Sequence, residues 1–469
     1  MKIKKNTVIS LFVIAMILIF CPFFVDNIYF SILMSSFSFL FILSLKNYKE
    51  DPFFVCFLLS FFVFLLGRPL ALELFNFTKP YAITFDDDTR NITYVYLTIS
   101  LISIYLGFVI SSKIKHTNKM QIDKEDILFN NTLLKFTKFL SVLLYLFVIV
   151  ENTFRLFFIK DVGYTTSYTF EGAYTLPLGL HYLVEIAPIA LCLFLACFPT
   201  KKEAKIPLFL FLIANIILAL SGNRFELISS FLLIIIYFII RNKTDNDVWI
   251  KKKSIIIVIL FVPIAILVLQ FMIYWREGVY VNNIDSPYLS FLYGVGGSSD
   301  LICATEKYSN VALSNNVLYS FGNLWRSIHG NIIAKILGFY VKYQYQTIDM
   351  ALYGHSLSAS MTYFLYPQRY FAGYGLGGCY IAELLHDFSI WGIIIGNVIV
   401  GLIIGGFNKL RKGRIIYNFC CVFVISLFLR LPRDAFDYVL AEFIGIKNII
   451  AFLLIMIFAR QMAIKKRKI

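Results

Sequence analysis

The sequence predicts an all-α integral membrane protein with about 12 transmembrane helices, cytoplasmic N and C termini and one large extracytoplasmic loop. Hydrophobic residues make up 59% of the 469-residue chain and charged residues 15%, whereas soluble domains carry about 45–50% and 25%. The net charge of +15 comes largely from lysines in short blocks between apolar runs, where they orient membrane helices. We therefore expect membrane lipid, and no nucleic acid, to contact these charges.

Each span requires about 20 mostly apolar residues. The run after Met1–Lys5 is long enough to span and lacks a clear small-residue cleavage site, so we expect a first helix there and no signal peptide. An even number of spans returns the C-terminus to the side of the N-terminus. The runs that meet the requirement are 7–25, 28–45, 53–75, 92–111, 134–154, 177–198, 206–221, 225–241, 254–274, 380–407, 415–431 and 438–459.

Basic residues gather in every second connection between these runs, and the remaining connections are sparse in lysine. By the positive-inside rule, the basic connections lie in the cytoplasm. Both termini are then cytoplasmic and the longest connection is external. The basic blocks are Lys2–Lys5, Lys46–Lys49, Lys113–Lys119, Lys201–Lys205, Lys251–Lys253, Arg411–Arg414 and Lys465–Lys468.

The predicted spans divide the chain into helices one to nine (1–274), a large external loop (275–379) and helices ten to twelve (380–469). The loop is far longer than an ordinary connection. It is rich in Tyr, Leu, Ile and Phe and poor in charge, so we expect it to fold as a structured lid over a membrane-embedded site. Asn331–Val341 and Ala351–Tyr366 are apolar but too short to span, and we expect short helices on or re-entering the membrane surface.

Most of the eight cysteines fall inside apolar runs, where they are most simply small buried hydrophobes. Cys303 and Cys379 both lie in the external loop and could form a disulfide if that face is oxidising. Their spacing alone does not decide this. The sequence has no CxxC motif or Cys/His cluster, so we expect no metal.

Two arginines at the external ends of apolar runs are candidate site residues, because ionisable groups at membrane depth are costly. Arg224 follows Ser221, Gly222 and Asn223, and a tight turn there needs the glycine and asparagine but not the arginine. The alternative is an arginine that reaches lipid phosphate. Arg276 follows Trp275 and is equally well explained as an interfacial anchor.

The external turn Arg430–Asp437 carries two arginines and two aspartates, which is more charge than topology requires. Pro432 could begin the final helix, and Arg433 and Asp437 would then share one helix face. We favour a functional role for this turn, with a structural ion-pair cluster as the alternative.

A possible base lies at the start of the run 380–407, where Glu383, His386 and Asp387 share a helix face. A carboxylate beside an imidazole orients a base and tunes its pKa. The alternative is a histidine that is simply packed. Together with the external arginines, these residues suit a polyanion such as a lipid pyrophosphate, because guanidinium groups bind phosphate oxygens in pairs.

Four stretches resemble the Wzy-type O-antigen, or oligosaccharide repeat-unit, polymerases. They are Ser221–Arg224, Gly294–Ser299, Gly373–Leu384 and Leu431–Asp434. Each motif is short, but size, helix number and the late external loop are similar too, so the resemblance covers essentially the whole chain.

The resemblance implies an inverting glycosyltransferase of the bacterial cytoplasmic (inner) membrane that needs no cofactor. It would transfer the growing chain from undecaprenyl pyrophosphate to a new lipid-linked repeat unit, which makes both lipid-linked glycans its partners. A chain-length regulator and a flippase are further candidate partners. The expected pyrophosphate ligands are Arg224, Arg276 and Arg433, with Arg430 and Arg326 next. The expected base is His386, with Glu383 and Asp434 as rivals.

Two other functions remain open. An O-antigen ligase shares the architecture but passes the glycan to lipid A core. A flippase belongs to the transporter class, which typically shows internal repeats and midplane binding sites; this sequence shows no repeat. The sugars, the linkage formed, the choice of O-antigen or capsule, and the oligomeric state do not follow from the sequence.

Overall fold

The structure is a computed structural model. It describes residues 26–79, 83–113, 124–163, 167, 175–177, 179–245, 248–251, 260–271, 286–308 and 318–467. Every regular element in these ranges is helical, which agrees with the predicted all-α fold.

The first half of the chain supplies long helices. They are α2 (Ile28–Lys46), α3 (Pro52–Phe61), η2 (Phe62–Leu66), α4 (Gly67–Phe75), α5 (Asp87–Ser112), α6 (Lys124–Val162), α7 (Leu180–Ala196), α8 (Lys201–Leu220) and α9 (Arg224–Thr244). A shorter apolar helix, Leu260–Phe271, follows them.

The second half begins with the short helices of the loop and ends with long ones. The loop holds α11 (Pro287–Val295), η5 (Gly296–Ser298), α12 (Ser299–Tyr308), η6 (Tyr319–Phe321), α13 (Gly322–His329), α14 (Ile332–Leu337), α15 (Ile348–Tyr353), α16 (Leu357–Leu365) and α17 (Pro367–Phe371). The C-terminal part holds α18 (Tyr380–Gly406), α19 (Ile415–Phe428), η7 (Leu431–Arg433), α20 (Tyr438–Ile444) and α21 (Ile446–Arg467).

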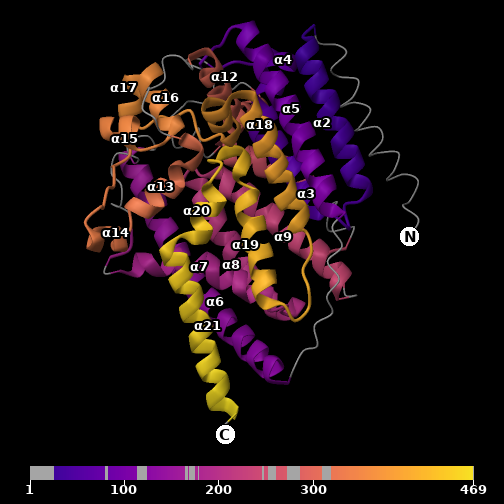
Figure 1. Ribbon diagram of the computed structural model, residues 1–469, viewed down its shortest axis with the longest axis vertical. Coiled ribbons are helices and arrows are strands. Elements are labelled where there is room, and N and C mark those ends of the chain that lie inside the picture. Colours follow the sequence, from indigo (N-terminus) through magenta and orange to yellow (C-terminus); the bar gives the residue numbers. More distant parts are fainter. Residues whose placement is uncertain are drawn as a thin grey trace.

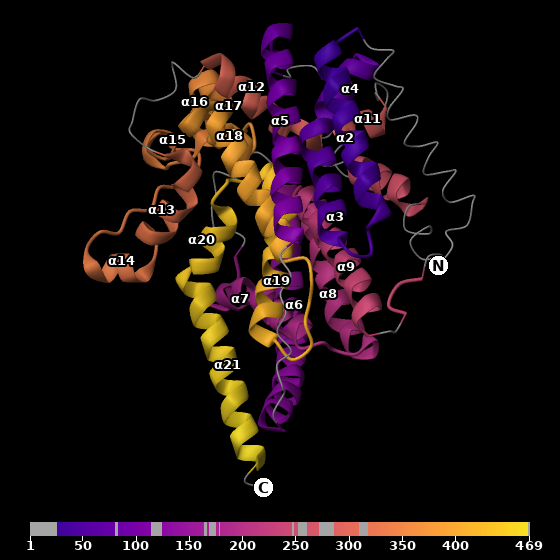
Figure 2. The same cartoon turned by 45° about the vertical axis from the view of Figure 1, so that its right-hand side comes forward.

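The long helices run side by side along the longest axis of the molecule (Figure 1). The short helices α12, α15, α16 and α17 gather at one end of this bundle, and the C-terminus of α21 lies at the other end. Figure 2 shows α13 and α14 beside the bundle, near α20. The loop therefore covers one end and one side of the helices.

Among the described residues, nine helical stretches are long and apolar enough to cross a membrane. They match the predicted spans between 28 and 111, 134–154, the two between 206 and 241, and 415–431, and they overlap the predicted spans 380–407 and 438–459. The predicted spans 177–198 and 254–274 correspond to the shorter apolar helices α7 and Leu260–Phe271. The predicted span 7–25 lies outside the described residues. The number of twelve and the orientation of the chain therefore stay predictions.

The predicted span 438–459 is wrong as a single helix. The chain leaves the helical conformation at Gly445 (φ −53°, ψ 122°), and α20 ends there. Asn448 Nδ2 donates to the carbonyl oxygen of Glu442 at 2.7 Å, which satisfies one backbone group at the break. The long final helix, α21, begins only after this break.

The predicted span 380–407 is also not one straight helix. Ser389 lies at φ 54° and ψ −150°, which no helix accommodates. The Tyr380 hydroxyl donates to Asn397 Oδ1 at 2.5 Å, although residues 17 apart in a straight helix are separated by about 25 Å. The segment before Ser389 must therefore fold back along the segment after it. We call this arrangement the α18 hairpin.

Small residues let the hairpin and its neighbour pack closely. A Cβ at Gly392 would collide with the carbonyl oxygen of Leu384 in the other arm of the hairpin. On the opposite side, a Cβ at Gly107 of α5 would collide with the Val398 carbonyl, and one at Gly401 with a carbonyl of α5. Close approach through glycine is typical of helix packing in membranes.

Cys303 and Cys379 are buried free thiols, so the disulfide that the sequence left open is not formed. Cys303 Sγ lies 3.2 Å from Thr93 Oγ1. Burial raises the pKa of both thiols to about 12. Such thiols are unreactive because the thiolate does not form.

Candidate active site

The long loop sends a buried turn, Val295–Ser298, into the helix bundle. Gly296–Ser298 form the short 3-10 helix η5 between α11 and α12. A Cβ at Gly296 would collide with the backbone nitrogen of Arg68, and one at Gly297 with its guanidinium group. Only glycine therefore lets this segment lie directly against α4. We call Val295–Ser298 the glycine turn.

Arg68 of α4 fixes the segments on both sides of the glycine turn. Its Nε donates to the Tyr293 carbonyl at 2.9 Å, its guanidinium carbon lies 4.3 Å from the centre of the Tyr293 ring, and it forms an ion pair with Asp300. Burial raises the pKa of Asp300, while the charge of Arg68 opposes this shift. Sequence reasoning missed Arg68, although a charge inside the apolar run 53–75 was a signal that could have found it.

Arg433 contacts the same turn from another element, and Arg224 lies against the residues of α11 just before it. Arg433, at the end of η7, donates from Nη1 to the Val295 carbonyl at 2.7 Å. Arg224, the first residue of α9, has its guanidinium carbon 5.6 Å from the centre of the Phe291 ring. A Cβ at Gly294 would lie 3.6 Å from Arg224 Nη2. The structure therefore brings together two arginines that the sequence predicted for one site.

Arg430 lies next to this pair and carries two carboxylate partners. Its Nη1 is 2.8 Å from Glu226 Oε1, and its Nη2 is 3.4 Å from Asp434 Oδ2. Its guanidinium carbon also lies 5.0 Å from the centre of the Phe225 ring and 4.8 Å from that of Tyr438. Burial raises the pKa of Asp434, and the charge of Arg430 opposes the shift. Because Asp434 pairs with Arg430, its carboxylate is less available to accept a proton from a substrate.

Arg68 and Arg433 thus contact the glycine turn, Arg224 lies against the end of α11 just before it, and Arg430, which precedes η7, lies beside Arg433. We call Arg68, Arg224, Arg430 and Arg433 the arginine cluster. Arg430 and Arg433 both lie over the Phe225 ring, the latter at 5.8 Å. Guanidinium groups stay charged in a low-dielectric setting and bind phosphate oxygens through paired hydrogen bonds. The arginine cluster therefore suits an anionic ligand at the loop end of the bundle.

The other two predicted arginines are not part of this cluster. Arg326 of α13 donates from Nη1 to the carbonyls of Gly354 and His355 at 2.7 and 2.9 Å, and it also bonds Asn323. It therefore holds segments of the loop together. Arg276 lies outside the described residues.

Glu383 is buried in the first arm of the α18 hairpin and binds the chain that follows η7. Its Oε2 accepts a hydrogen bond from the Phe436 backbone nitrogen at 2.9 Å. A buried carboxylate that accepts a backbone hydrogen bond fixes that backbone. The structure therefore gives Glu383 a supporting contact beside the Arg430–Asp437 turn.

His386 lies near the tip of the α18 hairpin and is oriented on two sides. Its Nδ1 is 3.0 Å from Asp387 Oδ1, and the other oxygen of Asp387 accepts from the Ser320 nitrogen at 2.7 Å. The Tyr319 ring stands edge-on to the imidazole, with centroids 4.9 Å apart. Because Asp387 holds Nδ1, Nε2 is the nitrogen left to accept a proton. The predicted carboxylate–imidazole pair is thus present.

The predicted helix through the Arg430–Asp437 turn is wrong. Pro432 lies inside the 3-10 turn η7, which ends before Asp437, and α20 begins after it. Arg433 and Asp437 therefore share no helix face. Asp437 instead accepts hydrogen bonds from Asn323 Nδ2 at 3.1 Å and the Leu324 nitrogen at 2.7 Å. Burial raises its pKa to about 6.

A second oriented histidine was missed by sequence reasoning. His181 Nδ1 lies 2.9–3.0 Å from both carboxylate oxygens of Glu151, and Glu151 also accepts from the Leu176 nitrogen at 3.1 Å. His181 Nε2 lies 3.9 Å from Glu185 Oε1. Glu151 is a buried carboxylate inside the predicted span 134–154, which was a signal for a functional group.

A polar cavity of about 350 Å³ adjoins the arginine cluster. It lies among α6, α7, α8, α9 and α19–α21, and Arg430 and Glu226 are part of its wall. Glu185, Lys447 and Asn152 line it elsewhere. We call this space the polar cavity. Its volume falls in the range of about 300–1,000 Å³ that is common for small-molecule sites.

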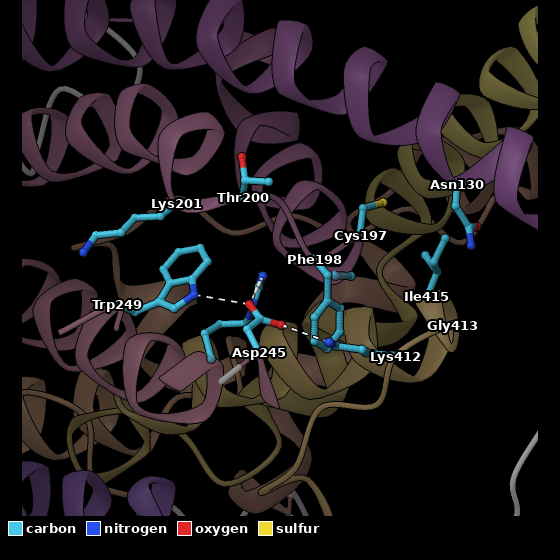
Figure 3. Close-up of a pocket in the computed structure, with 12 residues that line it drawn as sticks. Asn130, Cys197, Phe198, Thr200, Lys201, Asp245, Trp249, Lys412, Gly413 and Ile415 are labelled. Carbon is cyan, nitrogen blue, oxygen red and sulfur yellow. Dashed lines mark hydrogen bonds and ion pairs between the residues drawn. The ribbon is translucent and has the colours of Figure 1, made fainter. Parts of the chain in front are cut away.

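A cavity of about 390 Å³ lies at the other end of α9 (Figure 3). Its Arg241 is separated from Arg224 by 17 residues of α9, which corresponds to about 26 Å. Asp245 pairs with Arg241, accepts from Trp249 Nε1 at 3.2 Å and lies 3.5 Å from Lys412 Nζ. These charged groups satisfy one another, and they lie far from the arginine cluster. We therefore do not include this cavity in the candidate active site.

Comparison with known proteins supports a single family. No curated protein and no solved structure matches the chain. The family described as "O-antigen polysaccharide polymerase Wzy" matches residues 6–466, which is nearly the whole chain. This protein therefore belongs to the O-antigen polysaccharide polymerase Wzy family.

Proposed function

We propose that this protein polymerises undecaprenyl-pyrophosphate-linked repeat units into O-antigen or capsular polysaccharide at the outer face of the bacterial cytoplasmic membrane. Family membership supports repeat-unit polymerisation in general. The observation that supports the site is the approach of Arg224 and Arg433 to one short segment, the end of α11 and the buried glycine turn that follows it. Each arginine comes from a different element, so their proximity depends on the whole fold.

The proposed reaction forms one glycosidic bond and breaks another. A hydroxyl oxygen of the new repeat unit attacks the anomeric carbon of the growing chain, and the bond from that carbon to pyrophosphate breaks with inversion. The pyrophosphate leaves with the bonding electrons, so negative charge develops on its oxygens. Preorganised cations at that position lower the barrier most effectively.

We assign the main pyrophosphate contacts to Arg224 and Arg433. Arg430 comes next, because Glu226 and Asp434 already balance its charge. Arg326 is a more distant candidate because it bonds carbonyls of the loop. Arg276 remains a candidate on sequence grounds alone.

The acceptor hydroxyl must lose a proton, and we propose His386 as the base. Asp387 at Nδ1 orients its imidazole and stabilises the imidazolium that forms. Glu383 and Asp434 are weaker candidates because a backbone nitrogen and Arg430, respectively, bind their carboxylates. His181 and Glu151 form a second histidine–carboxylate pair, which makes His181 another candidate base.

The proposed partners are the lipid-linked donor and acceptor glycans and the surrounding membrane lipid. A chain-length regulator is a further proposed partner, and so is a flippase, since the substrates must reach the outer face. The proposed reaction consumes no nucleotide sugar at this face and requires no cofactor.

Gene deletion and complementation test this function. The strain is complemented with wild type, Arg224→Ala, Arg433→Ala, His386→Ala and, as a control, Arg460→Ala, an exposed arginine of α21. Surface polysaccharide is then separated on a gel. We expect the deletion to reduce the ladder to one repeat, and wild type and Arg460→Ala to restore it. The arginine-cluster variants should not restore it.

Other outcomes identify the alternatives. A ladder that persists in the deletion strain contradicts a polymerase. Complete loss of surface glycan indicates the ligase or the flippase. Lipid-linked repeat units that accumulate on the inner face would then specify the flippase.

A further inference from the structure

The polar cavity is lined by charged groups that balance one another. Three carboxylates, Glu185, Glu226 and Glu442, accompany three cations, Arg155, Arg430 and Lys447. Two ion pairs join members of the two sets, at 2.8 Å between Glu226 and Arg430 and 2.8 Å between Glu185 and Lys447. The lining therefore has no net charge to attract an anion. Six ionisable groups among membrane helices are nonetheless far more than packing requires.

Several uncharged polar groups of this cavity offer hydrogen-bond acceptors. Asn152 and Asn215 donate from Nδ2 to the carbonyls of Ala214 and Phe211 at 2.9 and 2.8 Å, which leaves each amide oxygen to accept and one N–H of each amide to donate. The Ser229 hydroxyl donates a hydrogen bond to the Phe225 carbonyl oxygen at 2.9 Å.

Ser230 and Ser426 behave like Ser229, because their hydroxyls donate to carbonyls of their own helices at 2.9 and 2.7 Å. Each serine oxygen keeps its acceptor capacity. Together with the carboxylates, these groups make a lining that suits a ligand with many O–H donors. A neutral sugar fits this lining, because its hydroxyls can bind the acceptors and its C–H faces can pack on the apolar lining residues, such as Ile189 and Leu233. A lipid tail would leave the acceptors without partners, and a phosphate would face the carboxylates.

The position of the cavity relates it to the arginine cluster. Arg430 lies in the cavity wall and over the Phe225 ring, and Arg433 lies over the same ring. A ligand in the cavity is therefore next to a ligand at the arginine cluster. This adjacency is what a glycosyl transfer between two lipid-linked glycans requires.

We propose that the polar cavity binds an uncharged sugar of the repeat unit that accepts the growing chain. This inference rests on the proposed function, because the acceptor is defined by the transfer reaction. The acceptor-rich lining binds the sugar hydroxyls, and the arginine and lysine side chains supply donors for its ring and glycosidic oxygens. The cavity thus separates acceptor recognition from pyrophosphate recognition.

Direct binding to the purified full-length protein in lipid nanodiscs tests this separation. One probe is the single-repeat oligosaccharide released from the lipid carrier by mild acid, and the other is inorganic pyrophosphate. The cavity variants are Asn215→Leu and the milder Ser229→Ala, whose lost hydrogen bonds lie within their own helices. Thr98→Val is the matched control, because Thr98 makes the same kind of bond in α5 but does not line the cavity.

We expect Asn215→Leu to weaken oligosaccharide binding by about tenfold, because the leucine cannot make the hydrogen bond that the asparagine makes to the sugar. Ser229→Ala should weaken it less, and Thr98→Val should not change it. Pyrophosphate binding should show the opposite pattern, with loss in Arg433→Ala and no change in Asn215→Leu. The elution profile and thermal unfolding of each variant identify any that fails to fold.

The inference is overturned if folded Asn215→Leu and Ser229→Ala proteins bind the oligosaccharide as wild type does. It is also overturned if pyrophosphate displaces the oligosaccharide, since both would then occupy one site. These results differ from a failure of the proposed function. That failure is a ladder that persists after gene deletion, whatever the binding data show.

Discussion

Glu226 Oε1 lies 2.8 Å from Arg430 Nη1, and this ion pair joins the start of α9 to the turn before η7. Both residues line the polar cavity, while Arg430 also belongs to the arginine cluster. The two proposed subsites therefore share one charged wall. Asp434 is a second carboxylate partner of Arg430, at 3.4 Å, outside the lining of the cavity.

The first prediction concerns the stability of this wall. Arg430→Ala leaves Glu226 and Asp434 as half-buried charges without their cation, which costs less than the roughly 3–5 kcal/mol of a fully buried pair. Glu226→Ala is milder, because Asp434 still accompanies the arginine. The double variant should be less destabilised than the sum of the two singles. Unfolding in detergent solution measures the stability of the two single variants and the double variant relative to wild type. Strictly additive effects would show that Glu226 and Arg430 are not coupled.

The second prediction separates charge from shape at Arg433. Arg433→Lys keeps the positive charge but loses the planar fork that binds two phosphate oxygens. We expect it to retain part of the activity. Arg433→Ala should lower the polymerisation rate by about a hundredfold or more, as removal of a transition-state donor does.

The assay for this prediction follows chain extension of purified lipid-linked repeat units. Arg460→Ala, in the exposed part of α21, controls for loss of a cation elsewhere. Equal activity of the lysine and alanine variants would mean that a positive charge at position 433 does not by itself raise the rate. Full activity of both would remove Arg433 from the site.

The third prediction compares the two oriented histidines. His386→Gln and His181→Gln each remove a basic nitrogen beside a carboxylate while keeping a polar side chain. If His386 is the base, His386→Gln should lower kcat by about 10²–10⁴-fold with little change in KM. His181→Gln should then have a small effect. The reverse pattern would transfer the role to His181, which Glu151 orients.

Much of the fold was predictable because a membrane helix requires only length and hydropathy. Helices α2, α5, α8 and α9 lie where the apolar runs predicted them. The α18 hairpin was not predictable in this way, because apolar residues lie on both sides of Ser389 within 380–407 and no proline marks the break. The break depends on how Gly392 accommodates the Leu384 carbonyl, which is a contact between the two arms.

The site was predictable only in part for a related reason. Arg224 and Arg433 stand at the ends of apolar runs, where an isolated charge is conspicuous in a sequence. Arg68 stands inside a run and was predictable by the same rule. Its partner Asp300 is 232 residues away, however, so their ion pair exists only in the folded protein.

The fourth prediction follows from the raised pKa of Asp437. Its folded-state pKa of about 6 exceeds the ordinary value of 3.8, so the folded protein binds this proton more tightly than the unfolded chain. The stability that this carboxyl contributes is complete below about pH 4 and is lost as the pH rises through about 6. Asp437→Asn cannot ionise and still offers an oxygen to the Leu324 nitrogen.

We therefore expect Asp437→Asn to gain about 2–3 kcal/mol over wild type at neutral pH, and nothing at about pH 4. Unfolding curves of both proteins across this range measure the difference, and the other titrating groups cancel between them. A difference that does not change with pH would show that Asp437 keeps an ordinary pKa in the folded protein.

The fifth prediction tests the α18 hairpin through two glycines. A Cβ at Gly392 would collide with the Leu384 carbonyl oxygen and the Phe388 Cβ, neither of which can move without shifting the backbone. A Cβ at Gly396 would meet only the end of the Leu384 side chain, which can change its rotamer. Both glycines lie in the helical second arm, so replacing either one by alanine removes the same backbone conformational freedom.

Gly392→Ala should therefore destabilise the protein by about 1–3 kcal/mol relative to Gly396→Ala. Because His386 lies near the hairpin tip, we expect Gly392→Ala also to lower polymerisation more than Gly396→Ala does. Thermal unfolding and the chain-extension assay give the two readouts. If residues 380–406 formed one straight helix, alanine would favour it at both positions, and each variant would be as stable as wild type or more so.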